Sequence, residues 1–337
     1  MLDQRPRFLI AIALILLLLP FIQRESLGAA IDVDGVLTSN KRQLDQITTW
    51  KMCVSDATTW SESVPDRIES PIPTIATAVY IRDGDRRDVD SSLVSAERKS
   101  LIVLKQRTVI NGYYLSYVKS PEDSAFIAQY AANGSDHVQA IGLGCEPFLE
   151  GHGVDPGCIT DILKKAADRH LLHDLQLIGG HKCIVVTGNC TPFGSYTLWC
   201  DPELGYLARK LVILKSGNDL IGSRKVNTLR FEGLGHKPVA LASLTYTVDD
   251  FKFTEVGGKV IPAACQMVTR HEYADGNWHI AIDKCERSDI RTTLDRSPAN
   301  VFHPDLPDGT RLANLEDPLE PYVWQGGKPA PLGESPK

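Results

Sequence analysis

The sequence lacks the short motifs of the common catalytic and nucleotide-binding sites. It contains no Gly-x-Ser-x-Gly, no phosphate-binding P-loop, no Gly-x-Gly-x-x-Gly and no His-Glu-x-x-His. None of its eight cysteines forms a Cys-x-x-Cys pair, so the spacing indicates neither a zinc knuckle nor a thioredoxin-type redox site. We therefore expect a chain without catalytic residues, a bound metal or a cofactor.

An excess of positive charge is also missing. The chain has 36 Lys and Arg against 42 Asp and Glu, a formal net charge of −6. A general nucleic-acid binder needs a basic face to neutralise phosphates, so we expect no nucleic-acid partner. An apolar fraction of 43% and a charged fraction of 23% are those of a folded globular protein rather than a disordered chain.

The N-terminus has the features of a secretory signal. Arg5 and Arg7 precede an apolar run over residues 8–22, and small residues follow at 28–30. We expect residues 1–30 to be removed after Ala30 and the protein to be periplasmic or otherwise exported. The run is shorter than the about 20 residues of a spanning helix. The alternative is that residues 8–22 remain as an inner-membrane anchor.

Extended patterns with turn residues between them fill most of the remaining chain. Asp-Gly or Asn-Gly stands between extended arms at 83–84, 111–112 and 275–276, and these dipeptides supply the positive φ of tight hairpin turns. The stretch "GSYTLWCDPELGYLARKLVI" (194–213) also predicts a hairpin, with its turn from Asp201 to Gly205. Other strand-like stretches cover residues 48–56, 181–190, 238–253 and 259–286. The fold class expected is mainly β.

Two helices are expected among these strands. Residues 37–47 read as a short opening helix capped by Ser39 or Asn40. Residues 158–174 place apolar side chains on one face of a 3.6-residue period, so this helix must bury a stripe against the sheet. The stripe comprises Ile159, Ile162, Leu163, Ala166, Ala167 and His170. We expect Leu163 and Ala166 to point into the concave face of the sheet.

The C-terminal part changes character near Pro298. Eight of the 20 prolines lie from that residue onward, and proline suits sheet edges and coil because it cannot donate a ladder hydrogen bond. We expect an extended segment lying on the domain as far as Trp324, followed by a loose end. The expected divisions are a signal peptide (1–30), one domain (31–300) and an extended tail (301–337).

Histidines and aromatic residues leave alternatives open. His170 with His173, and His271 with His279, form pairs without a third ligand nearby, so we expect solvated histidines rather than a metal site. Strand aromatics are usually core residues, and the alternative is that they line a hollow that holds an apolar ligand. These aromatics are Trp50, Tyr114, Trp199, Tyr246 and Trp278.

Several stretches resemble the bacterial lipoprotein-carrier superfamily that includes LolA, LolB and RseB-like proteins. They are the amphipathic helix, "GGHKCIVV" (179–186), "YTLWCDPELGYLARKL" (196–211) and "PDGTRLANLEDPLEPYVWQGGKP" (307–329). The chain is most similar to the relatives described as outer membrane lipoprotein-sorting proteins, and the resemblance covers about residues 38–330. It implies a half-open antiparallel β-barrel closed by short helices around an apolar cavity.

The resemblance also implies a function. Such carriers shield acyl chains from water and perform no bond chemistry, while other relatives are sensors that bind lipoproteins or regulatory partners. An arginine inside the barrel is expected to correspond to Arg209. The expected ligand-lining residues are therefore Trp50, Tyr114, Leu163, Ala166, Trp199, Arg209, Tyr246 and Trp278.

Three functional hypotheses follow. The first is an exported, non-enzymatic protein that holds a lipid or a lipoprotein acyl chain in the half-barrel. The second is an envelope sensor or protein-interaction module that uses the outer sheet face or the C-terminal tail. The third is a hydrolase with an unrecognised site, because pockets on such folds can acquire chemistry.

Export would allow disulfides, and hairpin register suggests their pairing. Residues opposite each other in an antiparallel pair have a constant index sum, which is 550 for Cys265 and Cys285 around the turn at 274–276. Cys183 with Cys200 is the second expected pair. Cys145 with Cys158 is the third, and Cys53 and Cys190 are then either unbridged or joined to each other. The alternative is that all eight cysteines are reduced and packed.

Overall fold

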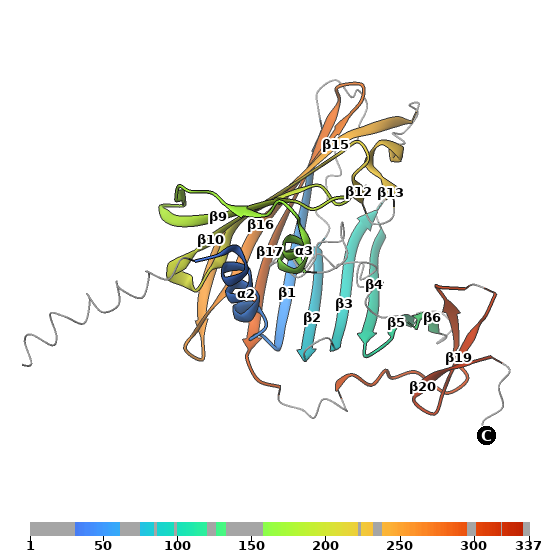
Figure 1. The fold of residues 1–337 in the computed structure, drawn as a ribbon. Helices are drawn as coiled ribbons and strands as arrows, with labels where there is room; N and C mark the ends of the chain where they lie inside the picture. Colours follow the sequence, from blue (N-terminus) through green and yellow to red (C-terminus); the bar gives the residue numbers. More distant parts are fainter. Residues whose placement is uncertain are drawn as a thin grey trace, which may run out of the picture.

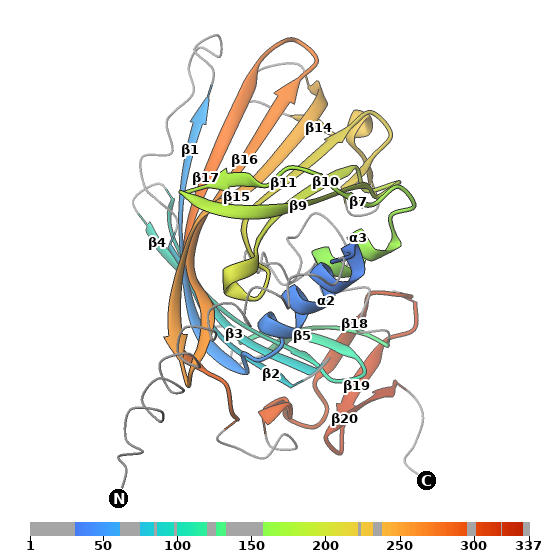
Figure 2. The ribbon, with the colours of Figure 1, turned by 60° about the vertical axis from the view of Figure 1, so that its left-hand side comes forward.

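The computed structural model describes residues 31–60, 75–83, 86–97, 100–119, 126–132, 158–221, 224–231, 238–294, 301–317 and 319–332. The expected signal peptide and its cleavage after Ala30 lie outside these residues. Among the described residues, no helix is long and apolar enough to cross a membrane. The chain forms a large, mostly antiparallel sheet that curls into a half-barrel, as expected for the fold class (Figures 1 and 2).

Most neighbouring strands of the sheet are consecutive in sequence and antiparallel. In spatial order its long strands are β9 (His181–Asn189), β10 (Ser195–Asp201), β11 (Leu207–Ser216), β15 (Val239–Val256), β16 (Lys259–Tyr273), β17 (Trp278–Arg291), β1 (Thr49–Trp60), β2 (Ile75–Asp83), β3 (Arg86–Glu97), β4 (Ser100–Ile110), β5 (Tyr114–Lys119) and β6 (Phe126–Ala131). Its short strands are β7 (His170–Leu171), β8 (Gln176–Ile178) and β14 (Arg230–Phe231). Outside it lie two 3-10 helices, η3 (Pro202–Leu204) and η4 (Val226–Thr228), and a separate two-stranded sheet of β12 (Leu220–Ile221) and β13 (Arg224–Lys225).

Irregular pairing bends the longest strands. The register of β15 against β16 shifts twice between Asp249 and Phe253. Asp250 lies there with φ of 50°, a left-handed conformation that aspartate tolerates better than most residues. Such bulges bend a strand and increase its twist, so they give the sheet a concave and an outer face.

Helix α2 (Val33–Leu44) lies on the concave side (Figure 2). It begins at Val33 rather than at residue 37 because Asp32 caps it, its carboxylate accepting from the Gly35 N–H at 2.7 Å. The expected caps were therefore wrong, since Ser39 and Asn40 lie inside the helix. Val36 and Leu37 of this helix are fully buried.

Helix α3 (Ile159–Lys165) is shorter than the expected 158–174. Ala166 already has an extended conformation, and the Arg169 guanidinium donates to its carbonyl oxygen at 3.1 Å. His170 and Leu171 instead form β7, which pairs with β9. Their backbone groups are therefore bonded in the sheet and not in a longer helix. Ile159, Ile162, Leu163 and Ala166 are buried, while Ala167 and His170 are exposed and do not belong to the buried stripe.

The hairpin predictions held for several turns. The loop at 274–276 gives the expected index sum, so Cys265 lies directly opposite Cys285. The turns at Asn111-Gly112 and Asp201–Gly205 also join the expected strands, with Gly112 at φ of 74°. Turn residues that require positive φ therefore fixed these registers correctly.

The disulfide predictions were not confirmed. Within the described part of the chain, no two cysteines lie at disulfide distance. Opposition alone does not join Cys265 to Cys285, because the Cβ separation depends on whether the pair is hydrogen-bonded. Cys200 lies opposite Ile184, so Cys183 and Cys200 point to opposite faces of the sheet.

The remaining cysteines do not form the other expected bridges. Cys145 lies outside the described residues, and with it the expected Cys145–Cys158 bridge. Cys53 is exposed on β1, whereas Cys190 is buried in the core, and the two are not at disulfide distance from each other.

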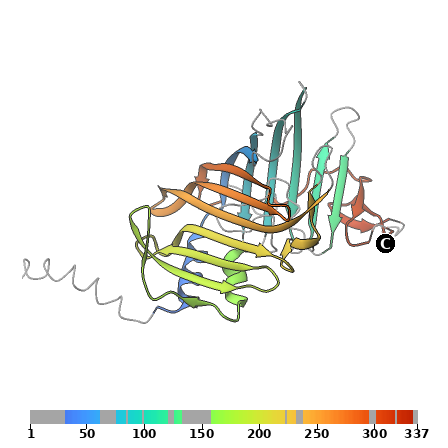
Figure 3. The same cartoon turned by 90° about the horizontal axis from the view of Figure 1, so that it is seen from above.

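The C-terminal tail covers the outer face of the sheet at its β5–β6 end (Figure 3). Its strands are β18 (Arg311–Asn314), β19 (Tyr322–Gln325) and β20 (Lys328–Pro331), and β18 pairs in parallel with β6. Trp324 is 1% exposed and packs with Leu115, Tyr117 and Leu312. The chain remains paired beyond Trp324 as far as Pro331, so the expected loose end begins later than predicted.

Proline blocks the free edge of this tail. Leu332 donates its N–H to the Pro321 carbonyl oxygen at 2.9 Å. Because N–H groups alternate along a strand, those of every second residue back from Leu332 also face β19. Pro329 and Pro331 occupy the alternate positions that face outward. Because proline has no N–H, this edge offers no donor to another strand.

Replacing Trp324 by alanine should destabilise the fold by about 3–5 kcal/mol, because it leaves a cavity in a buried cluster. Leu319→Ala is the matched control: Leu319 is 90% exposed, so its loss should change stability by no more than about 0.5 kcal/mol. Urea unfolding measures both. Equal stability of the two variants would show that the tail is not docked as described.

Candidate functional site

The concave face carries one large apolar cluster beneath α2 and α3. Tyr114 from β5, Leu163 and Ala166 from the α3 region and Tyr246 from β15 all belong to it. Each is at most 3% exposed. Four of the expected ligand-lining residues, distant in sequence, thus meet in one place. In the described residues they contact protein neighbours, so the helices fill this part of the half-barrel.

The other expected lining residues lie elsewhere. Trp199 points to the face opposite Leu198 and Cys200, and Trp278 to the face opposite His279, because successive strand residues alternate. Neither tryptophan belongs to the concave cluster. The side chain of Trp50 is outside the described part of the structure.

Cationic side chains lie over the two tryptophan rings on the outer face of the sheet. The Lys210 Nζ lies 5.4 Å from the centroid of the Trp199 ring, and the Arg270 guanidinium carbon lies 5.2 Å from that of Trp278. Such pairs are favourable on an exposed sheet face and do not require a ligand.

Asp201 explains the position of Arg209. This aspartate is 1% exposed and accepts the Arg209 Nε–H at 2.6 Å and the Glu203 N–H at 2.8 Å. His181 Nδ1 lies 3.6 Å from the same carboxylate. Arg209 follows a register shift between β10 and β11, which a strict alternation from Leu207 to Leu211 could not anticipate. The Arg209 side chain is 13% exposed, and its guanidinium carbon lies 5.1 Å from the centroid of the Phe253 ring, which packs against the concave cluster. Its expected position inside the barrel stays a prediction, and its pair with Asp201 fixes the β10–β11 turn.

The two thiols near this turn are poor nucleophiles. Burial, with the Asp201 charge nearby, raises the pKa of Cys183 to about 11. Burial also raises the pKa of Cys200. Both remain protonated at neutral pH, and the thiolate is the reactive form.

Asn40, which the sequence suggested as a helix cap, is instead a buried polar residue inside α2. It is fully buried in α2, and its Nδ2 donates to the Tyr206 carbonyl oxygen at 2.7 Å. Among the described residues, its Oδ1 atom is buried without a hydrogen-bond partner. An unmet buried acceptor costs about 1–3 kcal/mol, so this atom could accept from a polar group of a ligand.

Two histidines face the concave side of β16 and β17. His271 lies opposite His279, and their rings stack with centroids 4.1 Å apart. His279 Nδ1 is 2.8 Å from the Tyr273 hydroxyl. Burial lowers the pKa of His271. Within the described residues, no group of three or more His, Cys, Asp or Glu is arranged to hold a metal.

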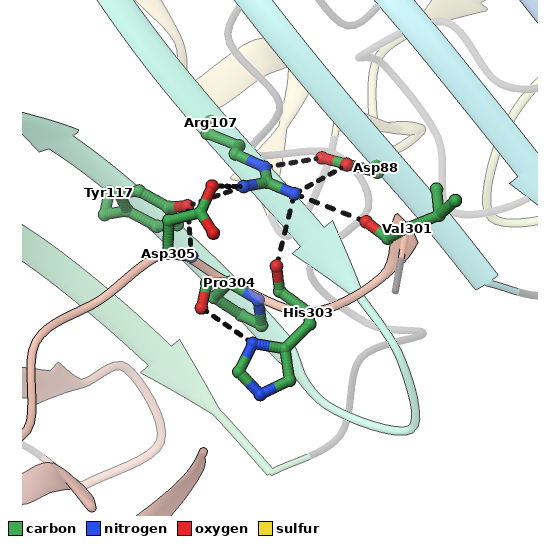
Figure 4. Close-up of polar contacts among 7 residues, drawn as sticks. All are labelled: Asp88, Arg107, Tyr117, Val301, His303, Pro304 and Asp305. Carbon is green, nitrogen blue, oxygen red and sulfur yellow. Dashed lines mark hydrogen bonds and ion pairs between the residues drawn. The ribbon is translucent and has the colours of Figure 1, made fainter. Parts of the chain in front are cut away.

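A polar clasp on the outer face holds the tail (Figure 4). Arg107 of β4 binds Asp88 of β3 through Nε and Nη2, at 3.0 and 2.9 Å. Its Nη1 donates to Asp305 of the tail at 2.6 Å, and its Nη2 donates to the carbonyl oxygens of Val301 and His303 at 3.3 Å. One guanidinium therefore joins two strands to the start of the tail.

Burial differs sharply between the two carboxylates of this clasp. The Asp88 side chain is 9% exposed and that of Asp305 is 87% exposed. Burial raises the pKa of Asp88, against the lowering effect of Arg107. Burial alone would lower the pKa of Arg107, but its bonds to the Asp88 carboxylate raise it above the ordinary value. The buried Asp88 carboxylate therefore depends on its ion pair with Arg107 more than the exposed Asp305 carboxylate does.

Comparisons with known proteins gave no matching family and only weak similarity to the solved structures described below. No family model and no curated protein matches the chain. MucB, solved in complex with MucA(peri), aligns over 80% of this chain and 96% of its own, at 10% identity and a TM-score of 0.23. The ywiB protein from Bacillus subtilis aligns over 72% and 94%, at 8% identity and a TM-score of 0.17. This likeness is weak and at fold level, so neither protein's role is transferred to this chain.

Replacing Arg107 by methionine should destabilise the protein by about 3–5 kcal/mol, because it leaves the buried Asp88 carboxylate without its ion partner. Asp305→Asn removes the exposed partner of the same guanidinium and should cost at most about 1 kcal/mol. Combining Arg107→Met with Asp88→Asn should recover part of the loss. Thermal and urea unfolding measure all three, and an equal effect of Arg107→Met and Asp305→Asn would contradict the assignment of the inner pair.

The lowered pKa of His271 predicts a pH effect on stability. The folded state resists protonation of this ring, so stability is retained above the unfolded pKa of about 6.5 and declines as the pH falls below it. His271→Gln should lose less stability than the parent between about pH 7.5 and about pH 5. His173→Gln, at an exposed position, should lose as much as the parent. An unchanged pH dependence in His271→Gln would refute the effect.

Proposed function

We propose that the chain is an exported, non-enzymatic binding protein that holds the acyl chain of a lipid or lipoprotein on the concave face of its half-barrel. The observation that carries this proposal is the apolar cluster that contains Tyr114 and Tyr246 of the sheet together with Leu163 of α3. The ligand would enter between α3 and the sheet and replace contacts that the helix now makes. Export through residues 1–30 is part of the proposal, with an anchor formed by residues 8–22 as the alternative.

The energies favour a long acyl chain over a small apolar molecule. Moving α3 away from the sheet would expose Ile159, Ile162 and Leu163, at a cost of about 5–9 kcal/mol. Each buried methylene contributes about 0.8 kcal/mol, so about ten of them offset that cost. A ligand of a few carbon atoms could not displace the helix.

Polar atoms at the site supply orientation rather than chemistry. The unmet Asn40 Oδ1 could accept a hydrogen bond from a hydroxyl or amide near the lipid headgroup. The nearby thiols are protonated, which disfavours nucleophilic catalysis by them. These features support binding without bond cleavage.

The second candidate is an interaction or sensor module. The tail covers the outer face over β5 and β6, but the outer face of β11, β16 and β17 carries half-exposed Val212, Val268, Ile280 and Ile282. Apolar side chains in such a strip suit contact with another protein.

A reversible tether tests the role of α3. A Cβ atom added at Gly188 of β9 would lie 3.1 Å from the Ala166 Cβ, a few tenths of an ångström below the range that disulfides span. In the double variant Ala166→Cys/Gly188→Cys, oxidation should lower uptake of a fluorescent long-chain fatty acid at least about tenfold, because it removes the open state. Reduction should restore uptake.

The single variants Ala166→Cys and Gly188→Cys control for oxidation of the native cysteines. Equal uptake by the oxidised and reduced double variant would show that α3 does not cover the site. Native mass spectrometry of the parent after mild extraction should also find co-purified lipid. A lipid-free parent that fails to bind the fatty acid would reject the proposed function and leave the interaction module as the better hypothesis.

A further inference from the structure

Ion pairs join opposite ends of α2 and α3. The two helices are neighbours over the concave face (Figure 2). Arg169, just beyond the end of α3, has its Nη2 atom 3.3 Å from the Oδ2 atom of Asp34 in the first turn of α2. Lys41, in the last turn of α2, has its Nζ atom 4.0 Å from the Oδ2 atom of Asp161 in the first turn of α3. The start of each helix thus lies against the end of the other.

This charge pattern specifies how the helices fit together. Along α2 the acidic Asp34 comes first, and the basic Lys41 follows about two turns later. The segment that contains α3 repeats this order, with Asp161 before Arg169. In a parallel arrangement the two acids would meet and the two bases would meet, so like charges would repel. The antiparallel arrangement of the structure satisfies both pairs.

Arg169 also holds the end of α3 itself. Its Nη1 atom donates to the carbonyl oxygen of Ala166, the residue that ends the helix, at 3.1 Å. The last carbonyl groups of a helix lack intrahelical partners, and a cationic side chain stabilises them. The preceding residue is fixed to β9, because the Asn189 N–H donates to the Asp168 Oδ1 atom at 2.7 Å. One guanidinium therefore links the end of α3 to α2 from a backbone position that the sheet holds.

Solvent reaches the side chains of both pairs. Arg169 and Asp34 are 31% and 56% exposed, and Lys41 and Asp161 are 37% and 45% exposed. The Lys41 Nζ atom is also shared with Asp45, at 3.4 Å. An exposed ion pair changes an equilibrium constant about fivefold at most, and salt weakens it. These pairs are therefore too weak to hold α3 alone, but they are strong enough to adjust how often a short helix opens.

We propose that the pairs Arg169–Asp34 and Lys41–Asp161 form an ionic latch, which holds α3 against α2 and sets how often α3 opens. Burial of Ile162 and Leu163 supplies most of the energy of closure. The latch makes closure depend on ionic strength, so that a rise in salt concentration favours the open form. As a regulation of ligand uptake, the latch rests on the proposed function of the concave face.

Native-state amide hydrogen exchange of the ligand-free protein tests the latch by charge reversal. Asp34→Arg places a second cation against Arg169 and should speed the exchange of the α3 amides about fivefold to tenfold. Asp34→Arg/Arg169→Glu restores the attraction and should return this exchange to within about threefold of the parent, since the bond to the Ala166 carbonyl oxygen is not restored. Asp174→Arg is the matched control, because it makes the same substitution at an exposed position outside the latch and should leave the exchange of α3 unchanged. The amides of β15 should exchange alike in all variants, which would show that the fold is intact.

Salt provides a second measurement. Raising the NaCl concentration from about 10 mM to about 500 mM should speed the exchange of α3 in the parent about threefold, because it screens the latch. Asp34→Asn/Asp161→Asn should exchange faster than the parent at low salt and should not respond to the increase. The proposal is overturned if Asp34→Arg exchanges like Asp174→Arg, or if the charge swap exchanges as fast as Asp34→Arg. It is also overturned if salt speeds the parent and the uncharged variant equally.

Uptake of a fluorescent long-chain fatty acid separates the latch from the proposed function. If the concave face binds acyl chains, uptake by Asp34→Arg should rise in proportion to the opening of α3. Exchange of α3 that follows these predictions, without fatty-acid uptake by any variant, would reject the proposed function and retain the latch. Equal uptake by the parent and Asp34→Arg, while α3 opens more often in the variant, would contradict the role of the latch in uptake.

Discussion

Between Asp249 and Phe253, β15 slips twice against β16, and the two longest hairpin strands bend at that place. A flat sheet of this extent would present two similar open faces. The bend makes one face concave, so that two helices of 12 and 7 residues can cover a large apolar area. The left-handed backbone of Asp250 belongs to this bend, and the burial of Tyr246 and Val248 just before it depends on the helices that the curvature admits.

Each face is closed by a segment that is distant in sequence from most of the strands it covers. The concave face receives α2 and α3, and the outer face over β5 and β6 receives the C-terminal tail (Figures 2 and 3). The two covers differ in strength. The tail is held by a buried tryptophan, a parallel strand pair and the Arg107 clasp, whereas α3 has seven residues and rests on a few apolar side chains. In the proposed function, that difference makes α3 the element that would move to admit a ligand.

The sequence was most informative where a turn residue requires a special backbone. The Asp275-Gly276 turn gave the register of β16 and β17, down to the opposition of Cys265 and Cys285. The prediction of register failed where a longer connection joins the strands. Across residues 190–194 the register is shifted by one residue, which puts Cys183 and Cys200 on opposite faces. The bulge that turns Arg209 to Asp201, and the clasp around Arg107, depend on contacts between strands that no local pattern contains. For the same reason Asn40 was interpreted as a helix cap, although it is buried in α2 and bonded to the Tyr206 carbonyl oxygen.

The central claim is that α2 and α3 form a movable cover on a rigid curled sheet. Native-state amide hydrogen exchange, followed segment by segment, measures the free energy of opening of each element directly. In the absence of ligand, the amides of α3, and to a lesser degree those of α2, should exchange through local opening well before those of β15 and β16. Addition of a long-chain fatty acid should speed the exchange of α3, because the ligand replaces the contacts of this helix with the sheet, and should leave the exchange of the strands unchanged. Protection of α3 equal to that of β15 in the ligand-free protein would contradict the account, because the helix would then open only when the whole domain unfolds.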